Sequence, residues 1–112
     1  MRGQAVPFDT RGGTEDRRAA ILGATARIEW NSLAPHFARG ELLVVDPLLD
    51  LVDVAEALTL DDSAAVSGWL RAGQLAVASD AQASDWHTRA PDCLWAVVIR
   101  PWVLVQERVQ RH

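Results

Sequence analysis

The apolar residues of this chain gather in short unbroken runs, and the length of a run limits the structure that it can form. Leu42–Val45 contains four residues and Leu94–Ile99 contains six. Runs of this length are far too short to cross a bilayer, but they match strands buried in a sheet. The sequence does not open with a positively charged and then apolar leader, so we expect a cytoplasmic protein.

Segments with a helical spacing of apolar residues separate these runs and predict an alternation of helices and strands. Capping residues such as Asp50 and Ser79, and breakers such as Gly73 and Pro91, set the expected helix ends. We expect helices at Thr14–Ile28, Ser32–Phe37, Leu51–Thr59, Asp62–Ala72 and Ser79–Ala90. We expect strands at Leu42–Val45, Gln74–Ala78, Leu94–Ile99 and Trp102–Gln106, with Pro101 in a bend between the last two.

The order of these elements is typical of winged-helix domains, because a helix pair joined by a short turn precedes the final strands. We predict a winged-helix-like α+β domain, with three to four helices packed on a small, mainly antiparallel sheet of three or four strands. A different three-layer α+β arrangement is the alternative. The expected domain is residues 14–108, after a flexible tail at 1–13 and before a frayed end at 109–112.

Composition fits one domain and removes several chemistries. The chain has 112 residues, 49% of them hydrophobic, which is enough for one core. All 11 basic residues are arginines, which excludes a Schiff-base lysine and a P-loop lysine. The single cysteine, Cys93, cannot form an internal disulfide, and with three histidines it offers little for a metal site. We therefore expect no cofactor.

The net charge of −4 is unevenly distributed along the chain. Residues 41–92 carry ten acids and two arginines, and both flanking segments are net positive. An acidic middle segment repels phosphate backbones, and Arg71 is the one base on the helix expected at Asp62–Ala72. Nucleic-acid binding is therefore disfavoured, and an atypical helix-turn-helix regulator remains the alternative function.

The remaining polar motifs predict neither catalytic, cofactor-binding nor metal-binding residues. Asp85 and His87 lie two positions apart on a helix, so they point to different faces. Cys93 follows Asp92, whose charge is expected to raise the thiol pKa. The clustered carboxylates are Asp46, Asp50, Asp53, Asp61 and Asp62. They lack calcium-loop spacing and mostly suit helix starts, so an enzyme is the least supported class.

Five tryptophans occur in the sequence, and they divide into two groups. Trp69 and Trp86 lie on inner helical stripes and are expected in the core. Trp95 and Trp102 lie on the last two expected strands, where they form either the floor of the core or an apolar edge. Tryptophan and arginine are enriched in binding hot spots. The candidate protein interface is therefore Trp95, Arg100, Trp102 and Arg108.

Several segments also resemble a known family. They are Thr25–Trp30, His36–Gly40, Leu49–Ala55, Leu94–Val98 and Pro101–Arg108. The resemblance is to a bacterial family of small uncharacterised proteins, domain of unknown function 2288, and covers about Glu15 to Arg108. It implies a bacterial, cytoplasmic, one-domain protein and brings no activity, cofactor or catalytic residue.

Together these features favour a non-enzymatic protein-binding or adaptor module. The acidic helix pair is expected to meet a basic partner, and the Trp95–Trp102 edge is expected to supply the apolar contact. A second copy of the chain is one candidate partner. We expect no membrane contact, and no small-molecule substrate is evident from the sequence.

Overall fold

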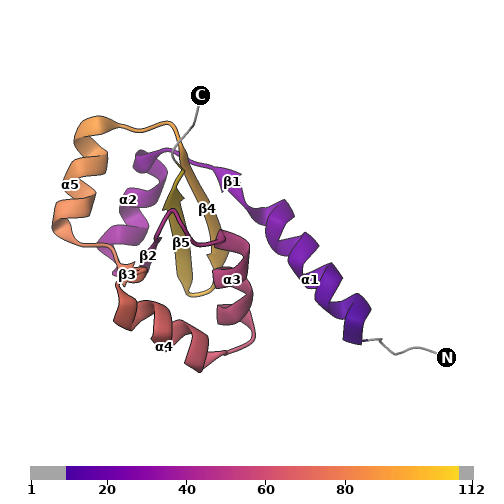
Figure 1. Cartoon of the computed structure of the whole chain (residues 1–112). Coiled ribbons are helices and arrows are strands. Elements are labelled where there is room, and N and C mark those ends of the chain that lie inside the picture. Colours follow the sequence, from indigo (N-terminus) through magenta and orange to yellow (C-terminus); the bar gives the residue numbers. More distant parts are fainter. Residues whose placement is uncertain (1–9, 109–112) are drawn as a thin grey trace.

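The computed structural model describes residues 10–108, which form five helices and a five-stranded mixed sheet (Figure 1). The helices are α1 Thr10–Ala24, α2 Trp30–Ala38, α3 Leu51–Thr59, α4 Ser63–Ala72 and α5 Asp80–Arg89. The strands are β1 Ala26–Arg27, β2 Leu42–Val45, β3 Leu75–Val77, β4 Leu94–Ile99 and β5 Trp102–Glu107. None of the described helices is long and apolar enough to span a membrane.

The strands lie in the order β1-β4-β5-β2-β3. β4 and β5 form an antiparallel hairpin, in which Leu94 pairs with Glu107 and Ile99 pairs with Trp102. β5 runs parallel to β2, and the other pairings, β1 with β4 and β2 with β3, are antiparallel. The last strand of the sequence therefore lies at the centre of the sheet.

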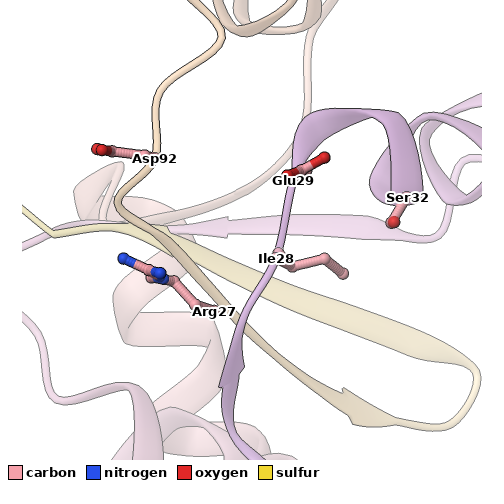
Figure 2. Close-up of a pocket in the computed structure, with 5 residues that line it drawn as sticks. All are labelled: Arg27, Ile28, Glu29, Ser32 and Asp92. Carbon is pink, nitrogen blue, oxygen red and sulfur yellow. The ribbon is translucent and has the colours of Figure 1, made fainter.

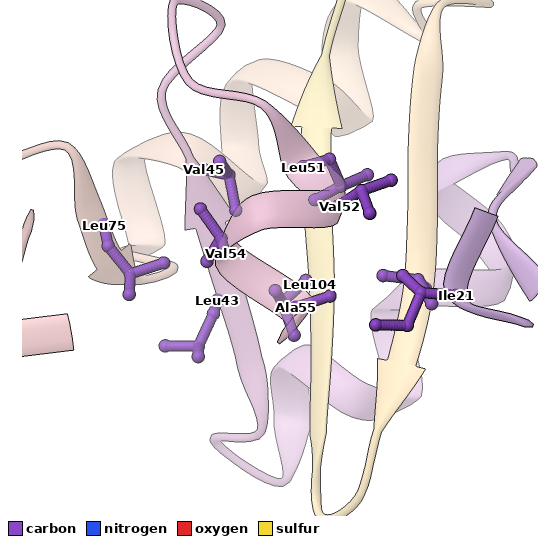
Figure 3. Packing of buried hydrophobic residues seen from close by; sticks show 10 residues of the cluster. Ile21, Leu43, Val45, Leu51, Val52, Val54, Ala55, Leu75 and Leu104 are labelled. Carbon is purple, nitrogen blue, oxygen red and sulfur yellow. The ribbon is translucent and has the colours of Figure 1, made fainter. Parts of the chain in front are cut away.

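Helices cover both faces of the sheet, and each face has its own core. α1, α3 and α4 pack on one face, and α2 and α5 pack on the other. The first core, shown in Figure 3, is Ile21, Leu43, Val45, Leu51, Val52, Val54, Ala55, Leu75, Val97 and Leu104. The second core is Trp30, Leu33, Leu42, Ala83, Trp86, Leu94, Ala96, Val103 and Val105.

The unbroken apolar runs explain why the sheet is buried on both faces. Successive side chains of a strand point to opposite faces, so Leu43 enters the first core while Leu42 and Val44 pack with the second. An alternating apolar and polar strand would leave one face to solvent. The continuous run Leu42–Val45 is instead typical of a strand between two layers of helices.

The mixed α+β class is confirmed, but the winged-helix arrangement and the element counts are not. The helix expected at Ser79–Ala90 is present as α5, but it packs on the sheet instead of extending from it as a wing. Trp86 of α5 is 1% exposed and packs beside Trp30 of α2, with ring centroids 6.0 Å apart. Burial of these large aromatic side chains holds α5 against the sheet, and the result is the alternative three-layer arrangement.

Several expected helix ends were wrong. α1 begins at Thr10 and ends at Ala24, and β1 follows where the helix was expected to continue. α2 begins at Trp30 rather than after Ser32, so Pro35 lies inside it and deprives one carbonyl of its hydrogen bond. Of the tail expected at residues 1–13, only 10–13 are described, and these are helical. The expected frayed end at 109–112 lies outside the described residues.

The predicted caps were mostly right, because a cap depends on neighbouring residues. Asp50 accepts a hydrogen bond from the backbone of Val52 at the start of α3, and Ser79 accepts one from Gln82 before α5. Gly73 has the left-handed conformation (φ 75°) expected of a residue that follows a helix. α4, which was expected to begin at Asp62, begins at Ser63, and Asp62 is its cap.

Candidate functional site

Two of the four predicted interface residues meet at one end of the sheet. The guanidinium of Arg108 lies 4.8 Å from the ring centroid of Trp95, in a cation–π contact. Its Nε donates to Oε1 of Gln106 at 3.1 Å. Trp95 is half-buried and packs against the first core. The first core and Gln106 therefore hold the Trp95–Arg108 pair in place.

Gln106 also fixes the turn that precedes α3. Its side chain is 2% exposed, and its Nε2 donates to the carbonyls of Asp46 (2.9 Å) and Leu49 (2.7 Å). Within the turn, the Asp46 carboxylate accepts from the backbone N–H of Leu48 at 2.8 Å. A loop with this many internal bonds has little conformational freedom left to lose on binding.

The same turn displays an exposed leucine. Leu48 is 88% exposed, and Leu22 on α1 is 62% exposed. A hollow of about 490 Å³ is lined by Leu48, Asp50 and Arg108, among others, and one of about 290 Å³ is lined by Leu22 with the same Asp50 and Arg108. The two leucines thus flank a shared charged wall. We call Leu22, Leu48, Asp50, Trp95 and Arg108 the Leu48 surface.

The other two predicted interface residues lie at the opposite end of the β4–β5 hairpin. Trp102 is half-buried against the first core. Arg100 is exposed at the turn, before the cis peptide bond to Pro101, and lines a hollow of about 450 Å³ with His36 and Arg39. The four residues do not form one continuous edge, because the length of the hairpin separates the two pairs.

A further hollow, of about 360 Å³, lies where the chain enters α2 (Figure 2). Figure 2 shows Arg27 and Asp92 projecting toward the same side, with Glu29 and Ser32 at the start of α2. Within residues 10–108, neither Arg27, Glu29 nor Asp92 forms an ion pair. The hollow contains charges of both signs but no close acid–base pair.

The polar side chains around Trp86 make contacts that hold the fold together. Arg89 bridges Asp85, four residues before it on α5, and Glu107 on β5, with N–O distances of 2.7 and 2.9 Å. The indole Nε1 of Trp86 also donates to Glu107 at 3.0 Å. The hydrogen bonds from Arg89 and Trp86 lower the pKa of Glu107, although burial opposes them. These contacts join α5 to the central strand.

The expected effect on Cys93 is confirmed in direction. Burial, followed by the charges of Glu107 and Asp92, raises the pKa of the thiol, which disfavours the nucleophilic thiolate. His36 lies near the hairpin turn, at the other end of β4 from Cys93. Among the described residues, no three histidine, cysteine, aspartate or glutamate side chains gather closely enough to hold a metal ion.

Much of the acidic surface has contacts within the chain. Arg18 of α1 lies 2.9 Å from Asp53 and 2.8 Å from Glu56 on α3, and Arg17 lies 3.4 Å from Glu56. These hydrogen bonds raise the pKa of Arg18. The basic partner of this part of the α3 surface is therefore α1, and no sequence pattern indicated that contact.

The sequence reasoning missed Leu22, Leu48 and Gln106. The sequence near Leu48 did contain an indication of its exposure. An apolar residue in the turn between Asp46 and Asp50 lies on no helix or strand face that would point into the core. Gln106 had no such signal, because its two acceptors lie 57 and 60 residues away in the sequence.

These features define a small three-layer α+β domain with a candidate site on its surface. The chain belongs to the family described as Protein of unknown function (DUF2288), whose model matches residues 16–107. It is similar to PA1075 from Pseudomonas aeruginosa, known from an NMR solution structure, at 46% identity and a TM-score of 0.75. That match covers 95% of this chain and 97% of the other. No curated protein matches the chain.

Proposed function

We propose that this domain is a non-enzymatic protein-binding module whose contact site is the Leu48 surface. The observation that carries the proposal is the 88% exposure of Leu48 on a turn held by Gln106. A leucine that is both exposed and rigidly presented can bury its side chain in a partner at little entropic cost. Burial of one such side chain contributes about 1.5–3 kcal/mol.

The composition of the Leu48 surface suits protein contact. Leu22 and Leu48 supply apolar area, and the Arg108–Trp95 pair supplies the residue types enriched in binding hot spots. Asp50 and Arg108 place opposite charges between the leucines. Recognition of phosphate groups would instead require several exposed, positively charged side chains.

Site-specific photo-crosslinking in the native cells tests this proposal. Leu48 is replaced by a photoreactive amino acid, and Leu60, which is 53% exposed at the end of α3, is replaced in the matched control. We expect a discrete protein cross-link from position 48, none from position 60, and loss of the product when Arg108→Asp is added. No product from position 48, or equal products from both positions, would refute the proposal.

A further inference from the structure

We propose that the partner bound at the Leu48 surface is a second copy of this chain, related to the first by a two-fold axis. This inference rests on the proposed function, because both use the same residues. It names the occupant of the surface, and it predicts which residues of the two copies face one another.

The charges of the surface complement themselves. A two-fold interface brings the same patch of both copies together, so an acid and a base within the patch can pair across the axis. Asp50 and Arg108 line both hollows, and neither forms an ion pair within residues 10–108. Asp50 of each copy would then pair with Arg108 of the other, so that all four charged groups have an opposite partner.

Other contacts hold the two charged groups in place within one chain. Asp50 caps α3 by accepting from the backbone N–H of Val52 at 2.9 Å. Arg108 lies over Trp95 and donates to Gln106. Each charge is therefore positioned by its own neighbours, and both remain available to a partner. Preorganised charges of this kind lose little freedom when they pair.

The apolar residues favour the same arrangement. Leu22 and Leu48 lie on opposite sides of the charged wall, so a two-fold axis through the wall would bring four exposed leucines into one interface. The net charge of −4 per chain disfavours contact between most surfaces of two copies. The Leu48 surface avoids this repulsion because Asp50 and Arg108 balance each other.

Sedimentation velocity of the full chain over a range of concentrations measures the association. We expect a species of about twice the 12.3 kDa of one chain. Leu48→Lys should weaken dimerisation by about tenfold or more, because it places two ammonium groups in an apolar contact. The matched control, Leu60→Lys at the C-cap of α3, should leave the dimer unchanged. Circular dichroism of each variant confirms that it is folded.

A charge exchange tests the pairing itself. Arg108→Asp places acid opposite Asp50 across the axis and should dissociate the dimer. Adding Asp50→Arg to the same chain should restore association, because the pair is then reversed. Asp50→Arg also removes the cap of α3, so its thermal unfolding is measured separately. An interface that does not join these two residues would not be rescued by the double change.

The results separate this inference from the proposed function. If the chain stays monomeric at every concentration and position 48 cross-links to a different protein, the second copy is refuted as the partner. The Leu48 surface is then still supported as a binding site. A dimer that persists in both Leu48→Lys and Arg108→Asp would overturn the dimer interface proposed at this surface. Dissociation by both variants and rescue by the exchange would support the inference.

Discussion

Gln106 connects two parts of the molecule that the chain separates widely. It is the one polar side chain in the buried set of the described residues, and its amide reaches two carbonyls of the turn before α3. Local sequence predicted the caps at Asp50 and Ser79, because a cap is satisfied within three residues. It could not predict Gln106, whose partners are adjacent only in the folded molecule.

Replacing Gln106 by leucine should destabilise the protein by about 1–3 kcal/mol, because the part-buried carbonyls of Asp46 and Leu49 lose the amide that donates to them. Urea denaturation followed by circular dichroism measures the change in the free energy of unfolding. Gln82→Leu on α5 is the control, since its side chain makes only a 3.5 Å contact with Asp85. Equal effects of the two substitutions would show that the amide of Gln106 does not hold the turn.

At the scale of elements, α1 packs mainly against α3, with a smaller contact to β4. Ile21 is its buried anchor, at 6% exposure, and Arg17 and Arg18 reach across to α3. Ion pairs at a solvent-exposed surface add little to stability. The helical spacing of apolar residues predicted this helix but placed its end too late, because β1 pairs with β4 through contacts far along the chain.

Adjacent residues of α1 offer a matched comparison. Ile21→Ala should destabilise the protein by about 2–4 kcal/mol through lost burial and a cavity in the first core. Leu22→Ala, which changes an exposed neighbour, should alter the free energy of unfolding of the monomer by no more than about 0.5 kcal/mol, measured at concentrations too low for two copies to associate. Amide hydrogen exchange should accelerate within α1 in the first variant only. Similar exchange rates in both variants would mean that α1 is not anchored through Ile21.

For the molecule as a whole, the sequence predicted most strands and helices but not their layering. The prediction that the run Leu42–Val45 forms a buried strand is confirmed. The winged-helix expectation came from element order alone, which does not determine how strands pair. The candidate site could likewise be predicted only in part, because its geometry depends on how the strands pair. Trp95 and Arg108 were named from residue type, but their separation from Trp102 depends on the hairpin register.

The two cores share one sheet, so we expect them to unfold together. Single-tryptophan variants retaining Trp86 report on the second core, and those retaining Trp95 report on the first. Their fluorescence transitions in urea, each compared with circular dichroism of the same variant, should coincide as in two-state unfolding. A tryptophan transition clearly separated from that of the secondary structure would mean that one layer of helices detaches before the other.

The position of β5 has a consequence for synthesis of the protein. This strand is translated after the other four described strands, yet it pairs with both β4 and β2 and contributes side chains to both cores. Until it has emerged from the ribosome, β2 and β4 have no common neighbour, and the apolar faces of the earlier helices have no complete sheet to cover. Folding of this domain is therefore completed only after β5 has been translated, and a nascent chain stalled before Trp102 would still expose the surfaces that β5 normally joins.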